Sequence, residues 1–467
     1  MVNKPNILII TFDCLRPDRL SITGYKGVHT PTFDKLMKDG VYFKNAYCQA
    51  PNTWISHASL FTGCNPNKHG MRTPVRKLSI TIPTMAEIFQ EAGYRTMGMP
   101  AMSLLSTQAG FNRGFDDYHL EDLLGNKNIL NHRFHRSSVN TLHLTRRWLR
   151  NISQPFFAWI HYFGIHKLDP AILDLPQNYR HEYSEYAQYY DGKVSYADEG
   201  FLSPLVEDLE ELGLIDNTIL VLCSDHGEDL SLVEHNSPQS GHNWSLTESV
   251  MRILLVIHAT KYMPSGLVRF DLAQSIDVLP TLLDLAGINL PNDQVEGRSL
   301  KLFNPSVDPI IYIENLCQGF VGLRKGNYKI VLSESGKSTK NIQENLRLKR
   351  KLDWRINLVK ETIQQLLPEK IRPTQPVFDP LTFWWQVKGE PEEVIKRLSA
   401  AADICLYDLA EDPDESQDIS GSQPEILLEM MTLLKRYAKS VTSIENAFET
   451  DLDRQIIEER LKKLGYL

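Results

Sequence analysis

The sequence predicts an α/β protein: a doubly wound sheet with helices on both faces, then a smaller C-terminal α+β region with a short antiparallel sheet. Three observations favour it. Two apolar runs, at 6–12 and 218–223, are each followed closely by an aspartate. Helical patterns lie between these runs, and short strand-like runs follow residue 300. Alternating strands and helices are typical of parallel sheets, whereas clustered short strands are typical of antiparallel ones.

The elements of the larger region follow from hydrophobic periodicity. The runs NILIITF and TILVLC are apolar at successive positions, which indicates central strands that are buried on both faces. The run ILLVIHA at 253–259 indicates one more buried strand. Apolar residues at helical spacing, each time followed by a glycine, predict helices over 84–92, 199–212 and 281–286.

The C-terminal region reads differently. Short strands are expected at 309–314, 319–324, 328–333 and 404–408, with Gly326-Asn327 as a hairpin turn. A charged, mostly helical insertion at about 337–400 interrupts them, and its composition favours a solvated amphipathic surface over a lid or an interface. Helices rich in Leu, Met and Lys end the sequence. We therefore expect a catalytic domain over 1–305 and a C-terminal subdomain over 306–467.

Composition limits the partners and the compartment. The 467 residues are 42% hydrophobic and 23% charged with a net charge of -8, which gives no electrostatic reason to expect nucleic acid or an anionic membrane. The sequence shows no signal-peptide pattern and no run long enough to cross a membrane. The six cysteines lack disulfide or metal spacing. We expect a soluble, cytoplasmic protein, and the sequence leaves its oligomeric state open, a homodimer included.

Polar residues that follow the two apolar runs predict a metal site. Asp13 follows the first run, and Asp225 and His226 follow the second after one serine. In a doubly wound sheet, ligands bind beyond the carboxyl ends of the strands, so these residues should meet in one cleft. Carboxylates suit hard divalent cations, and imidazole suits zinc-like ones. We expect one divalent cation (Ca, Mg, Mn or Zn), with a second left open.

A series of motifs then resembles a known family. NILIITFDCLRPDRLSITGY resembles the opening block of sulfatases, in the alkaline phosphatase superfamily, and TWISHASLFTGCNPNKHG resembles their nucleophile block. GFNRGFDDYH, HYFGIHKLDP, YDGKVSYADE, SDHGEDL and CLYDLAEDPDE resemble later blocks in the same order. The resemblance covers nearly the whole chain outside 337–400. It implies an alkaline-phosphatase-like fold and metal-dependent hydrolysis of a small anionic ester.

The resemblance also implies roles for single residues. Asp13, Asp225 and His226 would hold the metal, and Thr53 would be the nucleophile and a further metal contact. His57 takes the place of the arginine that supports the nucleophile in sulfatases.

Two further histidines fall in matching blocks. Either His166 or His242 would protonate the leaving group. Arg16 and Asp18 are expected to form a structural ion pair instead of binding substrate.

Departures from the family pattern bear on the reaction. Thr53 cannot become formylglycine, the aldehyde that sulfatases make from cysteine or serine. Ile55 replaces the motif proline, and Met99 replaces an anion-binding lysine. Cys14 replaces the second aspartate of the opening block, where it either favours a softer metal such as zinc or packs as a small neutral side chain.

These features leave three functional hypotheses. The first is a phosphate mono- or diester hydrolase, such as a phosphodiesterase, that uses Thr53. The second is a sulfuric ester hydrolase, or a transferase, that works without formylglycine. The third is an inactive binding protein that has kept the fold, because folds outlive individual functions.

Overall fold

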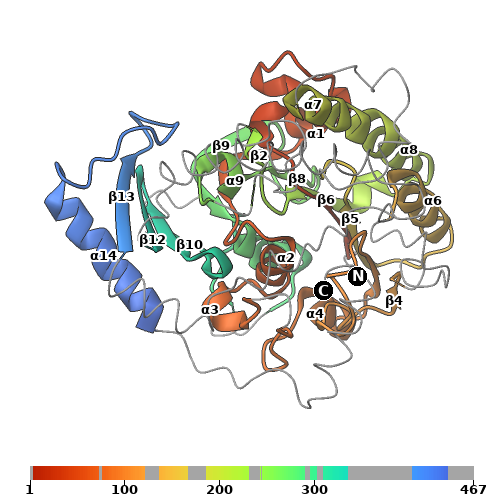
Figure 1. Cartoon of the computed structure of the whole chain (residues 1–467). Helices are drawn as coiled ribbons and strands as arrows, with labels where there is room; N and C mark the ends of the chain where they lie inside the picture. Colours follow the sequence, from red (N-terminus) through yellow and green to blue (C-terminus); the bar gives the residue numbers. More distant parts are fainter. Residues whose placement is uncertain are drawn as a thin grey trace, which may run out of the picture.

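The computed structural model describes residues 4–72, 76–120, 136–166, 186–230, 242, 245–289, 295–301, 309–334 and 402–439. Its largest element is a nine-stranded sheet in the order β4-β3-β5-β1-β6-β8-β2-β7, with β9 paired to β2 (Figure 1). The strands are β1 Asn6–Phe12, β2 Val41–Tyr47, β3 Arg95–Met99, β4 Asp117–Tyr118, β5 Phe156–Tyr162, β6 Thr218–Ser224, β7 Arg252–Ile253, β8 Leu255–His258 and β9 Leu267–Gln274.

The sheet is parallel in one half and mixed in the other. Strand β1 is parallel to both β5 and β6, and every residue of β1 and β6 is buried, so the two predicted central strands are confirmed. Strand β8 is antiparallel to β6, and β2 is antiparallel to β8. The run at 253–259 forms two short strands instead of one. Leu254 separates β7, which pairs with one end of β2, from β8, which pairs with the other end of β2.

Helices cover both faces of this sheet, as predicted. Alternate residues of β1 enter different hydrophobic clusters: Ile7 and Ile9 one, Leu8 and Ile10 the other. The first cluster includes residues of α2 Thr53–Thr62, α4 Met85–Glu91 and α10 Val278–Ala286. The second includes residues of α1 Pro31–Asp39, α6 Ser138–Leu149, α7 Tyr186–Ala197 and α8 Ser203–Glu211 (Figure 1).

The predicted helices form with small differences. Helix α4 begins after Thr84, whose hydroxyl accepts the Glu87 N–H at 3.2 Å while the Glu87 carboxylate accepts the Thr84 N–H at 2.8 Å. Helix α10 ends at Gly287, which has a left-handed φ of 67°. The segment predicted at 199–212 is divided into a π-helical turn over Asp198–Leu202 and α8.

Short elements complete the described part of the larger region. The one-turn helices are α3 Pro66–His69 and α9 Glu248–Met251, and the 3₁₀ segments are Pro17–Arg19, Ser21–Thr23, Ile215–Asn217 and Ser275–Asp277. A further 3₁₀ segment, Leu316–Gln318, lies in the C-terminal region. Among the described residues, no helix combines the length and apolar character needed to span a membrane.

A second sheet of four antiparallel strands follows, and it matches the predicted C-terminal strands. Its strands are β10 Ile310–Asn315, β11 Phe320–Lys325, β12 Tyr328–Glu334 and β13 Ala402–Asp408, and α14 Pro424–Lys439 packs on it (Figure 1). Gly326 and Asn327 join β11 to β12, as predicted. The insertion at 337–400 and the 305/306 boundary lie outside the described residues, so the domain division stays a prediction.

A buried ion pair joins the small sheet to the segment after α3. Arg72 donates from Nε and Nη2 to the two carboxylate oxygens of Glu314 in β10, both at 2.8 Å. The two side chains are 2% and 1% exposed, and the Tyr437 hydroxyl donates to the same carboxylate at 3.1 Å. This contact fixes the small sheet to the chain that follows the Thr53 helix.

We expect Glu314→Gln to lower the free energy of unfolding by about 3 kcal/mol, because breaking a buried ion pair leaves a charge without its counter-ion. Urea unfolding measures it. Glu210→Gln is the matched control, since its pair with Lys35 is exposed and should contribute less than about 1 kcal/mol. Equal losses in the two variants would contradict the expectation.

Candidate active site

The first feature of the site is the pair of strand ends that carry its acidic residues. Phe12 of β1 pairs with Ser224 of β6, so the residues that follow these strands are neighbours. Asp13, Asp225 and His226 are all buried, and ligand atoms from the three lie within 4.8 Å of one another. The structure therefore brings together the three residues that the sequence predicts as metal ligands.

Thr53 lies beside this group as the first residue of α2. The residue before it, Asn52, occupies the capping position, so Thr53 is not the helix cap. Thr53 Oγ1 lies 3.3 Å from Asp13 Oδ2 and 3.4 Å from His226 Nε2. The free backbone N–H groups of a helix N-terminus also favour an anion here. The hydroxyl predicted to be the nucleophile thus faces the acidic group.

The donor atoms of the group fit a divalent cation. His226 Nδ1 lies 2.9 Å from the Gly227 carbonyl oxygen, which only accepts, so Nδ1 carries the proton and Nε2 keeps a lone pair. That Nε2 lies 3.4 Å from Asp225 Oδ2, a buried oxygen without a hydrogen-bond partner among the described residues. Two electron-pair donors that face each other with no proton between them suit a positive ion.

His161 supports the Asp13 carboxylate. Its Nδ1 accepts the Ala101 N–H at 3.4 Å, so its Nε2–H donates to Asp13 Oδ2 at 3.2 Å. Burial lowers the pKa of His161 to about 4, which keeps the ring neutral near pH 7. His161 is not among the site residues that the sequence motifs predict. Its signal is a histidine within the otherwise apolar β5 run FFAWIHY.

His57 lies one turn after Thr53 and holds its backbone. His57 Nδ1 donates to the Thr53 carbonyl at 2.7 Å, and Nε2 accepts from the Thr11 hydroxyl at 2.9 Å. Burial, then the neighbouring His161, lowers the pKa of His57 to about 4. A neutral imidazole thus stands where the family places a charged arginine, and its contacts suit positioning of Thr53.

His242 lies on another side of the group. Its Nδ1 is 3.1 Å from Glu228 Oε2, and its ring centroid is 4.4 Å from that of His226. Burial alone would lower the pKa of His242, but Glu228, followed by Asp13 and Asp225, raises it above the ordinary value. Asp13, Asp225 and His226 together are called the cation group below. A protonated His242 next to them suits proton donation to a leaving oxygen. Glu228, which the sequence analysis does not single out, is marked by its place in SDHGE.

His166 also reaches the site. A ligand atom of its side chain lies within 4.8 Å of those of Asp13 and Cys14, and its ring centroid is 5.4 Å from that of His242. The ring stacks on Phe163 with the centroids 4.5 Å apart. Every predicted site residue therefore lies in one buried cluster. His57 lies behind Thr53, and His166 and His242 lie beside Asp13, Asp225 and His226.

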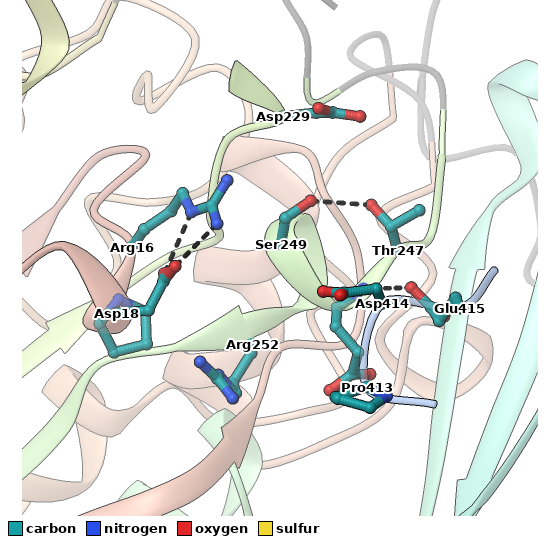
Figure 2. A pocket seen from close by; sticks show the side chains of 11 residues that line it. Arg16, Asp18, Asp229, Thr247, Ser249, Arg252, Pro413, Asp414 and Glu415 are labelled. Atoms are coloured by element: carbon teal, nitrogen blue, oxygen red, sulfur yellow. Dashed lines mark hydrogen bonds and ion pairs between the residues drawn. The ribbon is translucent and has the colours of Figure 1, made fainter. Parts of the chain in front are cut away.

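A pocket is lined by Arg16, three residues after Asp13, and by Asp229, which follows Glu228 (Figure 2). Arg16 and Asp18 lie on one side of it, and Asp414 and Glu415 lie on the opposite side. Arg16 donates to both carboxylate oxygens of Asp18, at 3.1 and 2.8 Å. The predicted ion pair is therefore confirmed, and it forms part of the pocket wall.

His69, in the H-G element after α2, gives a pH prediction for stability. Its Nδ1 accepts the Met71 N–H at 3.1 Å, so Nε2–H donates to Ser59 Oγ at 3.0 Å. Burial lowers the pKa of His69 to about 3, whereas an unfolded histidine titrates near about 6.5. Between these values the unfolded state binds the proton first, so stability is lost as the pH falls below about 6.5.

We expect His69→Asn to flatten this pH dependence. Urea unfolding of both proteins at about pH 7.5 and 5 measures it, because the first pH lies above both pKa values and the second lies between them, where only the unfolded His69 is protonated. The wild type should lose more free energy of unfolding on acidification than the variant does. An unchanged slope in His69→Asn would show that His69 does not titrate in this way.

Known proteins match the chain over this whole arrangement. A family model described as Sulfatase matches residues 5–288. An arylsulfatase from Clostridium perfringens is 27% identical over 387 residues, which cover 64% of this chain and 78% of the relative. An ulvan-active sulfatase from Formosa agariphila is 28% identical over 344 residues, which cover 66% of each chain.

Solved structures agree in fold. A protein in complex with its substrate D-glucosamine-2-N,6-O-disulfate has a TM-score of 0.66 and 16% identity, covering 96% of this chain and 100% of its own. The phosphonate monoester hydrolase of Agrobacterium radiobacter has a TM-score of 0.63 and 16% identity, covering 94% and 96%. The fold and the relatives define a hydrolase of the alkaline phosphatase-like superfamily. The chain belongs to the sulfatase family, whose members hydrolyse sulfuric ester bonds.

Proposed function

We propose that this protein hydrolyses the sulfuric ester of a small anionic substrate, with Thr53 as nucleophile and one divalent cation held by Asp13, Asp225 and His226. The observation that carries this proposal is the position of Thr53 Oγ1, 3.3 Å from Asp13 Oδ2 and 3.4 Å from His226 Nε2. The sulfatase relatives favour the sulfuric ester over the phosphoric ester that the sequence analysis places first.

The first half of the reaction transfers the sulfuryl group to the protein. A bound divalent cation would neutralise the anionic ester and favour ionisation of the Thr53 hydroxyl. Thr53 Oγ1 releases its proton to solvent, attacks sulfur and forms the Oγ1–S bond while the bond from sulfur to the leaving oxygen breaks. His242 gives its proton to that oxygen, so the leaving group departs as an alcohol. His57 holds the Thr53 carbonyl meanwhile.

The second half releases sulfate. The now neutral His242 takes a proton from a water molecule, and the water oxygen attacks sulfur. The Oγ1–S bond breaks and its electron pair returns to Thr53 Oγ1, which takes the proton of the hydrogen sulfate, so the Thr53 hydroxyl is restored and sulfate leaves. His242 regains its proton in this step, so the site returns to its starting state without any oxidant or reductant.

Hydrolysis of a phosphoric ester is the second candidate, and Thr53 itself favours it. A threonine hydroxyl cannot be converted to formylglycine, and direct attack by a hydroxyl is an established route to covalent phosphoryl intermediates. The same residues would serve, because both esters carry anionic oxygens and an alkoxide leaving group.

Matched substrates distinguish the candidates. The kcat/KM values for p-nitrophenyl sulfate, p-nitrophenyl phosphate and the corresponding phosphodiester should be measured on one metal-loaded preparation. We expect the sulfate to have the highest value. A higher value for either phosphorus ester would favour the second candidate, and no turnover of any ester by fully metal-loaded protein would favour a binding protein.

A further inference from the structure

We propose that Cys14 Sγ is a ligand of the same cation, so that the site takes a zinc-class ion in preference to calcium or magnesium. The inference rests on the cation group of the proposed function, but it concerns which ion is bound and not which ester is cleaved. It assigns a chemical role to the residue that most clearly departs from the family pattern in the opening block.

The backbone of Cys14 is held in an unusual conformation. Its φ is 62°, in the left-handed region that residues with a side chain rarely adopt. The Cys14 N–H donates to Asp225 Oδ1 at 3.2 Å, and the Tyr190 hydroxyl donates to the Cys14 carbonyl at 2.7 Å. Both contacts fix the peptide units on either side of the side chain, and one of them is made by a residue of the cation group.

This conformation directs the thiol toward the acidic group. Cys14 Sγ lies 3.0 Å from Asp13 Oδ1 and within 4.8 Å of a ligand nitrogen of His226. A sulfur that serves only as a small apolar side chain would be expected among hydrocarbon neighbours. Here the thiol contacts the Asp13 carboxylate, and His242 Nδ1 is 3.7 Å away.

A second observation indicates that the group suits a positive ion. Asp225 Oδ2 is buried, makes no hydrogen bond with any described residue and lies 3.4 Å from the lone pair of His226 Nε2. Glu228 Oε1 is also buried without a partner in the described part of the chain. The group therefore holds more negative and electron-donating atoms than its own protons satisfy.

The mixture of donor atoms selects the class of ion. Calcium takes 6–8 oxygen ligands and magnesium demands an octahedron of oxygens, whereas zinc accepts thiolate, imidazole and carboxylate together. His242 Nδ1 faces Glu228, and Cys14 adds a sulfur donor to the carboxylates and imidazole of the group. On binding, the Cys14 thiol releases its proton to solvent and the thiolate forms the bond to the ion, with no change of oxidation state.

Cobalt(II) tests the proposal directly, because it substitutes for zinc and absorbs in the near ultraviolet when a thiolate binds it. We expect this thiolate-to-cobalt band in the wild type and its loss in Cys14→Ser. Cys405→Ser is the matched control, since Cys405 lies in β13 of the second sheet, and it should keep the band. Circular dichroism of each variant checks that the fold is retained.

Competition titrations supply a second readout. Cys14→Ser should weaken zinc binding on the order of 100-fold and leave calcium binding nearly unchanged. Cys14→Asp restores the family carboxylate and should shift the preference toward calcium. A wild-type cobalt complex without the band, a band that persists in Cys14→Ser, or an unchanged zinc-to-calcium ratio would overturn the proposal. Loss of ester turnover alone would count against the proposed function instead.

Discussion

Replacing Thr53 with alanine is expected to lower kcat/KM for the preferred ester by about a thousandfold or more, because it removes the oxygen that attacks sulfur. The substitution should leave the fold intact, since Asn52 and not Thr53 occupies the N-cap of α2. Steady-state kinetics on p-nitrophenyl sulfate measure the loss, and thermal unfolding of the same samples checks the fold.

Thr53→Ser is the matched control for this prediction. Serine keeps the hydroxyl and loses only the methyl group, so it should retain far more activity than alanine does. Metal content should be determined for both variants, because Thr53 Oγ1 lies next to His226 Nε2. Full activity in Thr53→Ala at equal metal content would remove Thr53 from the reaction.

The second large effect is expected for Asp225→Asn, which should lose both the bound cation and turnover. The substitution removes the negative charge that Asp225 brings to the buried cation group, where its Oδ2 lacks a hydrogen bond among the described residues. A neutral amide is a weaker ligand for a divalent ion than a carboxylate is. Metal analysis after gel filtration measures occupancy, and the same fractions are assayed for hydrolysis.

Asp229→Asn provides the comparison, because Asp229 is also acidic and nearly buried but lines the neighbouring pocket, outside the Asp13 group. It should keep its metal. Removing metal from the wild type with a chelator should likewise abolish turnover, and adding back a divalent cation should restore it. Turnover that survives metal removal would contradict the role of the cation group.

The sequence predicts the centre of the fold because its signals are local. Strands β1 and β6 are recognisable from continuous apolar runs, and the side chains that follow them converge because the ends of parallel strands share one edge. Asp13, Asp225 and His226 are therefore predictable as a group. The strand ends do not place Thr53 near this group; only the resemblance to a known family does.

The supporting residues depend on strand order, which no local pattern encodes. His161 reaches Asp13 because β5 is the neighbour of β1, and Thr11 reaches His57 because α2 covers that face of the sheet. The strand order in the antiparallel half of the sheet cannot be predicted from local patterns either. Strand β2 lies between β8 and β7 although it comes far earlier in the chain, so its place follows from tertiary packing alone.

The most direct test of the central claim is mass spectrometry of wild-type protein quenched with acid during turnover of p-nitrophenyl sulfate, followed by digestion and sequencing of the modified peptide. The proposed mechanism predicts one sulfuryl group, carried by Thr53 in the peptide that includes the start of α2, and its absence from Thr53→Ala. A sulfuryl group on any other residue, or the same modification in Thr53→Ala, would contradict it.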